Sequence, residues 1–136
     1  MNINPNIFRE YDIRGIAGKD LTAEFAETLG QVYATWALKK LGAKTMTVSV
    51  GRDCRLTSDD YADALIRGLT KSGVNVIRIG VCPSPLTYFS VFHDKLDGGI
   101  MITGAHNLAE YNGFKIGFGK DTLHGSQIQE LKQIFL

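Results

Sequence analysis

The sequence predicts an α/β fold, namely a three-layer α/β/α domain with a mixed, mainly parallel sheet. Short β-branched segments alternate along the chain with longer segments of helical periodicity, which is the pattern of strands joined by crossover helices. The length of 136 residues suits one domain with a real core, and there is no repeat or linker, so residues 1–136 are expected to form a single domain. The ordinary hydrophobic content of 44% agrees with a globular chain.

The N-terminal half contains two predicted helices and the first internal strand. Residues 7–15, "IFREYDIRG", alternate in character and are expected to be extended as far as Gly15. Residues 20–42 have helical spacing, with Asp20 or Thr22 as the N-cap and Gly42 at the end. Residues 45–50 are predicted to form a strand, and residues 57–73 a helix capped by Thr57 or Ser58. The face of the first helix that is expected to be buried consists of Leu21, Phe25, Leu29, Val32 and Trp36.

The C-terminal half continues the alternation. Ser84 is expected to cap a short helix over residues 83–95, with Pro85 at its first position and Phe89 and Phe92 in the core. Asn112–Gly113 is a strong turn dipeptide, which would point Phe114 and Ile116 inward and Lys115 to the opposite face. The remaining segments are predicted strands at residues 74–80, 98–103 and 113–118 and a last helix at residues 125–136.

Two polar loops follow strands that are predicted to be parallel. One is "GRDCRLTS", residues 51–58, and the other begins after Thr103. The carboxyl ends of parallel strands lie at one edge of a sheet, where open α/β sheets bind their ligands. The two loops, about 50 residues apart, are therefore expected to lie at one site.

The second loop, within "MITGAHNLAEYNGFK" (residues 101–115), carries most of the candidate chemistry. Thr103 offers a hydroxyl, His106 an imidazole and Asn107 an amide, and the Lys115 ammonium is suited to phosphate binding or proton transfer. Ala105 stands at the centre, where a reactive side chain would be expected. The alternative is that the histidine and the amide only satisfy backbone groups and that the lysine is solvated.

Other charged residues fall in two loops. Arg14, in "EYDIRG", has the planar guanidinium that binds phosphate or carboxylate, with the Tyr11 hydroxyl nearby; an internal ion pair is the alternative. In "GRDCR", an internal pair between Asp53 and an arginine that fixes the loop is favoured over substrate contact.

Several function classes have no support. The formal net charge of +1 gives no reason to expect a nucleic acid or an acidic membrane surface as a partner. No Walker loop, dinucleotide-binding glycine motif or zinc-protease motif is present, and Cys54 and Cys82 lack metal-ligand spacing, so free thiols are expected. With no long apolar run or signal-peptide pattern, the expected location is the cytoplasm.

Three motifs together resemble those of the α-D-phosphohexomutases, the phosphomannomutase/phosphoglucomutase enzymes. "YDIRG", "GRDCRLTS" and "TGAHNLAEYNGFK" occur in the order found in the N-terminal domain of that family, and the resemblance covers essentially the whole chain. The third motif is the specific one, and in the family it reads approximately T-[AG]-S-H-N-P-x-x-Y-N-G-x-K. The resemblance implies domain 1 of a four-domain enzyme that interconverts hexose 1-phosphate and hexose 6-phosphate by phosphoryl transfer.

The resemblance also assigns roles to residues. Ala105 occupies the position of the family's phosphoserine, which also binds Mg²⁺ together with an aspartate-rich loop of the second domain. His106 would adjoin the phosphoryl group and Asn107 would support the loop. Lys115 and Arg14 would face the phosphoryl group, with Tyr11 and Thr103 close by.

Two residues depart from the family motif. Ala105 has no hydroxyl to carry a phosphoryl group or to bind Mg²⁺, so neither bound metal nor mutase activity is expected of this chain alone. Leu108 replaces a proline that would stiffen the loop.

One hypothesis is that the chain is one domain of a longer enzyme, whose sugar and metal sites lie in other domains. The faces of this domain that would contact the other domains would then be exposed in the isolated chain and would favour self-association. The other is a natural stand-alone domain that acts as a binding or interaction module.

Overall fold

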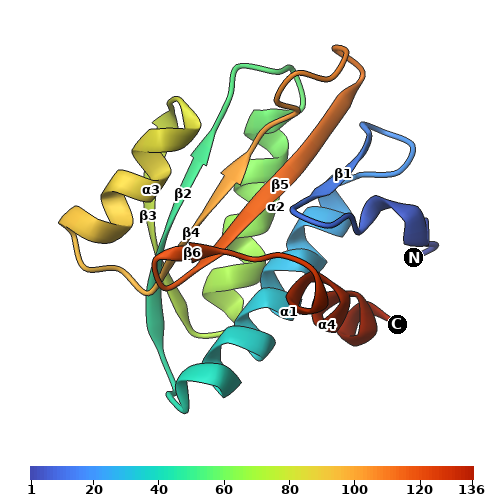
Figure 1. Cartoon of the computed structure of the whole chain (residues 1–136). Coiled ribbons are helices and arrows are strands. Elements are labelled where there is room, and N and C mark those ends of the chain that lie inside the picture. The colour runs from blue at the N-terminus through green and yellow to red at the C-terminus, as the bar shows by residue number, and fades with distance from the viewer.

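The computed structural model describes residues 1–136, and its backbone is a sheet flanked by helices (Figure 1). No helix has both the length and the apolar character that a membrane span requires. The elements are a 3₁₀ turn Pro5–Ile7, β1 Ile13–Ile16, α1 Ala23–Leu41, β2 Met46–Arg52, α2 Ser58–Lys71, β3 Val74–Val81, α3 Ser84–His93, β4 Gly98–Ile102, β5 Tyr111–Phe118, β6 Asp121–Thr122 and α4 Ser126–Phe135.

The sheet is mixed, with the strand order β1-β5-β4-β2-β3 and β6 paired to β5. The pairings β2–β3 and β2–β4 are parallel, whereas β5 is antiparallel to β4, β1 and β6. The strand β5 alone therefore runs against the other five. This confirms the predicted α/β/α domain with a mixed, mainly parallel sheet, and it places the ends of β2 and β4 at the same edge.

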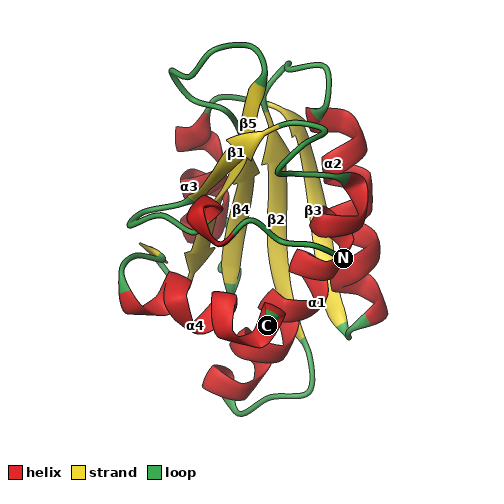
Figure 2. Cartoon of the chain, turned by 90° about the vertical axis from the view of Figure 1, so that its right-hand side faces the viewer, coloured by secondary structure: helices red, strands yellow, loops and turns green.

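Helices α1 and α2 lie on one side of the sheet and α3 on the other (Figure 2). We call the side under α1, α2 and α4 the sealed face, because its side chains belong to a core cluster of 28 buried residues. Helix α1 is capped by Thr22, whose hydroxyl accepts a hydrogen bond from the Phe25 N–H at 3.0 Å, and by Gly42 with φ of 64°. The sheet residues of the sealed face are Val48, Val50, Ile100, Ile102, Phe114 and Ile116.

The opposite side, which we call the open face, has one helix. Helix α3 packs over β2 and β4, where the Ser90 hydroxyl donates to the Ser49 Oγ at 2.9 Å. Phe89 and Phe92 were expected in the core, but each is 57% exposed. The expectation was wrong because α3 buries only its sheet-facing side, through Thr87, Ser90 and Val91, and no other element covers its outer side.

Two local predictions need correction, and a third, the N-cap of α2, is confirmed in position only. Ser84 is the first residue of α3 and makes no capping bond, while Pro83 holds the N-cap position. Thr57 is the N-cap residue of α2 but its side chain makes no capping bond. The N-terminal segment is extended only from Ile13, after the 3₁₀ turn and a bend, and not over residues 7–15.

Candidate functional site

The two polar loops meet at the carboxyl edge of the sheet, as the sequence predicts. Arg55, in the loop between β2 and α2, reaches across to the loop between β4 and β5, which we call the 103–111 loop. Its guanidinium donates to four backbone carbonyl oxygens, those of Leu108 at 2.7 Å, Asn107 at 2.8 Å, Tyr111 at 3.1 Å and Ala105 at 3.2 Å. One side chain thus organises most of the second loop.

Asp53 holds the Arg55 side chain in place through an ion pair. Its carboxylate accepts from Arg55 Nε at 3.2 Å, from the Gly104 N–H at 3.2 Å and from the Ser58 hydroxyl at 2.5 Å. Burial opposes ionisation of Asp53, but hydrogen bonds from Ser58, the Arg55 N–H and Thr103 hold the pKa of its carboxyl below the usual range. The favoured interpretation of "GRDCR", an internal aspartate–arginine pair that fixes the loop, is confirmed.

Ala105 lies exposed at the tip of the 103–111 loop with a strained backbone. Its φ of 50° is in the left-handed region, which a residue other than glycine rarely adopts. Its N–H donates to the Thr103 hydroxyl at 2.9 Å, and the Asn107 N–H donates to the Gly104 carbonyl at 3.0 Å. The loop therefore presents residue 105 to solvent in a conformation that its neighbours enforce.

Arg14 supports the same loop from β1. It is only 6% exposed, and its guanidinium donates to the Gly104 carbonyl at 2.9 Å and to the Asn107 side-chain oxygen. It also forms an ion pair with Asp12. An internal ion pair, one of the two alternatives for Arg14, is present, and the same side chain binds Gly104 and Asn107, on either side of Ala105.

Lys115 is the cation at the site without an internal partner. It pairs in register with Met101 on the open face, while Phe114 and Ile116 point into the core, so the predicted alternation is confirmed. The Lys115 ammonium makes no hydrogen bond or ion pair, although the residue is partly buried. Arg14 projects from the same face of the neighbouring strand, because its register partner Gly113 lies two residues before Lys115.

Two of the predicted site residues make no side-chain hydrogen bond. Tyr11 precedes β1 and is 69% exposed, and the His106 side chain is exposed beside Ala105. Neither side chain forms a hydrogen bond within the chain, so both remain available to a ligand. Of the other predicted residues, the Arg14 guanidinium contacts the Asn107 side chain and the Thr103 hydroxyl accepts from the Ala105 N–H, while Lys115 lies on the same side of the sheet as Arg14.

Asn112–Gly113 does not form the predicted turn but lies inside β5. The Asn112 side-chain amide donates to Thr57 Oγ1 at 2.8 Å and to Ser58 Oγ at 3.0 Å. A Cβ on Gly113 would lie 2.3 Å from the Ile13 carbonyl oxygen, so the glycine serves the close approach of β1. This polar link between α2 and β5 was missed, because its partners are 54 or 55 residues apart and nothing local marks them.

The site lacks the ligands that Mg²⁺ would need. No group of three His, Cys, Asp or Glu side chains is placed to hold a metal ion, and the Ala105 methyl group cannot coordinate one. The residues present therefore do not fit a complete metal site, and no chemical step is derived through a metal.

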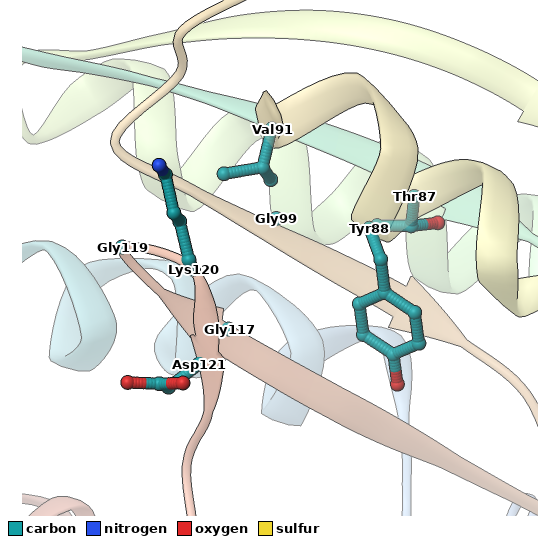
Figure 3. A pocket seen from close by; sticks show the side chains of 8 residues that line it. All are labelled: Thr87, Tyr88, Val91, Gly99, Gly117, Gly119, Lys120 and Asp121. Atoms are coloured by element: carbon teal, nitrogen blue, oxygen red, sulfur yellow. The ribbon is translucent and has the colours of Figure 1, made fainter. Parts of the chain in front are cut away.

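Neither cavity of the structure coincides with the two loops. One is a cavity of about 10 Å³ between α3 and the β5–β6 hairpin, lined in part by Tyr88, Gly117 and Lys120 (Figure 3). It has room for about one water molecule and none for a sugar phosphate. The other is a groove between α1 and α4, lined in part by Trp36 and Glu130, at the opposite end of the molecule from the loops.

Comparison with known proteins matches nearly the whole chain. Residues 5–136 match the family described as phosphoglucomutase/phosphomannomutase, alpha/beta/alpha domain I. The chain is 43% identical over 133 residues to a phosphoglucomutase of Neisseria meningitidis serogroup B, and 43% identical over 126 residues to a phosphomannomutase/phosphoglucomutase of Pseudomonas putida. These alignments cover 98% and 93% of this chain but only 28% and 27% of the relatives.

A solved structure agrees with the sequence comparison. The crystal structure of a phosphoglucomutase/phosphomannomutase family protein from Burkholderia thailandensis superposes with a TM-score of 0.88 at 35% identity. The match covers 97% of this chain and 30% of that one. The chain therefore spans less than a third of the length of these relatives.

Proposed function

Since this chain belongs to the phosphoglucomutase/phosphomannomutase family through its alpha/beta/alpha domain I, we propose that it is the domain that holds the phosphoryl-carrying loop of a hexose-phosphate mutase. The parent reaction interconverts hexose 1-phosphate and hexose 6-phosphate by phosphoryl transfer. Ala105 stands at the position of the phosphoryl carrier, so the chain itself is inactive. The remaining domains of a four-domain enzyme would supply the sugar, phosphate and metal sites.

The conformation of the 103–111 loop carries this proposal. Residue 105 is exposed at its tip in a left-handed conformation, over Arg55 and Arg14, which bind the loop carbonyls. Phosphoryl transfer depends on positioning and on positive charge more than on covalent help from the protein. A loop tip held by hydrogen bonds to two arginines supports that chemistry.

The roles of the neighbouring residues follow from their contacts. Lys115, which makes no internal ion pair, supplies charge or a proton to the transferring group. Arg14 stabilises negative charge while it holds the loop through Gly104 and Asn107. The Thr103 hydroxyl orients residue 105 by accepting a hydrogen bond from the N–H of that residue. The exposed side chains of His106 and Tyr11 contact the phosphoryl group or the sugar.

A chimera tests this proposal. Domain I of the Neisseria meningitidis phosphoglucomutase is replaced by this chain, with either Ala105 or the Ala105→Ser substitution. We expect conversion of hexose 1-phosphate with serine and none above background with alanine. Lys115→Met in the serine chimera should lower kcat by at least about 100-fold. Equal turnover by the alanine and serine chimeras would contradict the assignment of residue 105.

A second candidate function, an interaction module, is favoured by one surface. Helix α3 has no charged residue before His93, and its apolar side chains Leu86, Tyr88, Phe89 and Phe92 are at least 40% exposed. A contiguous patch of large apolar side chains exposed on a helix usually marks a surface that contacts another protein segment. We propose that this surface packs against another domain in a longer protein and that it mediates self-association in the isolated chain.

A further inference from the structure

A buried chain of hydrogen bonds joins β5 to the two loops through the first residue of α2. The Ser58 and Asn112 side chains are each 0% exposed. The Asn112 amide nitrogen lies 3.0 Å from Ser58 Oγ, and Ser58 Oγ lies 2.5 Å from one carboxylate oxygen of Asp53. The other carboxylate oxygen of Asp53 accepts from the Gly104 N–H and from Arg55 Nε, each at 3.2 Å. Ser58 therefore lies between a buried amide of the sheet and the carboxylate that holds both loops.

The direction of each hydrogen bond follows from the donors and acceptors that are available. Asn112 Oδ1 accepts from the Gly113 N–H at 2.9 Å, so the other end of that amide is its NH₂ group, which can only donate. This NH₂ group donates to Ser58 Oγ and to Thr57 Oγ1. Because Ser58 Oγ already accepts from Asn112, its single proton is left for the carboxylate of Asp53. Asn112 thus fixes Ser58 as a donor to Asp53.

The hydrogen bond from Ser58 favours the ionised form of Asp53. Burial raises the pKa of Asp53, and the Ser58 hydroxyl is the strongest of the groups that lower this pKa below its usual range. The nearby charged groups are Arg55, which is its ion-pair partner, and Arg52, which binds the Asp53 carbonyl and pairs with Asp59 of α2. Protonation of the carboxylate would turn one oxygen into a donor and remove an acceptor that the two loops use.

We propose that Ser58 is a positioning residue that sets the loop between β4 and β5 through Asp53. Ser58 makes no hydrogen bond to residue 105, but both groups that Asp53 holds adjoin that residue. Gly104 precedes residue 105 in the chain, and Arg55 binds the carbonyl oxygen of residue 105 at 3.2 Å. Loss of the Ser58 hydroxyl should therefore release the left-handed conformation of residue 105. The proposal rests on the proposed function for one point, namely that residue 105 is the phosphoryl carrier.

The first experiment uses the 136-residue chain, labelled with ¹³C and ¹⁵N. The ¹³C signal of the Asp53 carboxyl is followed between about pH 7 and about pH 2, and the strong amide–Hα Overhauser effect of Ala105 reports its left-handed conformation. Ser58→Ala should raise the pH at which Asp53 titrates and weaken the Overhauser effect, because the carboxylate loses a donor. Asn112→Leu should cause both changes as well, although Asn112 makes no hydrogen bond to Asp53.

Thr57→Ala is the matched control. Thr57 Oγ1 accepts from the same Asn112 amide at 2.8 Å but makes no hydrogen bond to Asp53, so this variant should change neither readout. Ser58→Ala combined with Asn112→Leu should shift the titration of Asp53 no further than Ser58→Ala alone, because the two residues act in series. If Asn112→Leu fails to fold, Ser58→Ala and Thr57→Ala decide the outcome.

The second experiment measures turnover by the chimera that carries Ala105→Ser. Ser58→Ala in this chimera should lower kcat by about tenfold or more, because a misplaced phosphoryl carrier slows the transfer step. KM should stay within about twofold, because the proposed sugar site lies in the other domains. Thr57→Ala in the same chimera should change neither constant.

Two results would overturn the inference. One is an Ala105 Overhauser effect that stays unchanged in Ser58→Ala, whether or not the titration of Asp53 moves. The other is a loss of turnover in Thr57→Ala that equals the loss in Ser58→Ala. An inactive serine chimera would reject the mutase role instead, and the spectra of the isolated chain would still decide whether Ser58 sets the loop.

Discussion

The sealed face and the loop edge of this domain are stabilised by different interactions. On the sealed face, Phe114 and its neighbours are buried among apolar side chains, and polar groups are few. At the loop edge, Asp53, Arg55 and Arg14 hold the backbone by hydrogen bonds and ion pairs, while large side chains such as Leu56 and Leu108 lie exposed. The fold therefore depends on the burial of apolar side chains, whereas the shape of the site depends on a few charged groups.

The largest expected effect is on the sealed face. Phe114→Ala should lower the free energy of unfolding by about 3–5 kcal/mol, because the ring is fully buried and its removal leaves a cavity. Phe92→Ala, the same change on the exposed side of α3, is the control and should cost within about 0.5 kcal/mol. Urea unfolding measures both. Similar losses of unfolding free energy in the two variants would show that the two faces do not differ in their contribution to stability.

A smaller effect, dependent on pH, is expected at the loop edge. Because the folded pKa of Asp53 lies below its ordinary value of 3.8, its contribution to stability is complete above that value and is lost as the pH falls through the folded pKa. Asp53→Asn should therefore cost about 1 kcal/mol at neutral pH, and progressively less in acid.

Urea unfolding at several pH values checks this expectation. Asp121→Asn, which changes an exposed carboxylate without a side-chain hydrogen bond or ion pair, should be neutral throughout. A cost of Asp53→Asn that stays constant down to pH of about 2 would show that the carboxylate does not stabilise the fold through its charge.

Substitutions on the outer side of α3 are expected to have the smallest effect on stability. They should reduce self-association instead. Phe89→Ser together with Phe92→Ser should leave the free energy of unfolding within about 0.5 kcal/mol. The double variant should be monomeric by light scattering at concentrations where the unchanged chain associates. A monomeric unchanged chain at high concentration would refute the proposed contact surface.

The sequence predicts the regular elements and the sealed face well because their signals are local. Helical spacing identifies Phe25, Leu29 and Trp36 as buried. The alternation in β5 places Lys115 on the opposite face of the sheet from Phe114. Meeting of the two loops is also predictable, since it follows from the parallel strands alone.

Contacts between distant segments account for what the sequence does not predict. The Asn112–Gly113 pair has the composition of a turn, but Asn112 is held by Thr57 and Ser58 and the pair becomes part of β5. Likewise, "GRDCR" suggests an internal ion pair, yet nothing in it indicates that Arg55 binds four carbonyls some 50 residues away. The exposure of Phe89 and Phe92 depends on which elements exist to cover α3, and local periodicity carries no such information.

The central claim is that residue 105 is the position of the phosphoryl carrier, and peptide mass spectrometry tests it most directly. The chimera with Ala105→Ser is incubated with a hexose bisphosphate and digested, and the peptide that contains residue 105 is fragmented. We predict one phosphoryl group on the new serine and none on the same peptide of the alanine chimera. A serine chimera that turns over substrate while residue 105 stays unmodified, or that is phosphorylated at another residue, would contradict the claim.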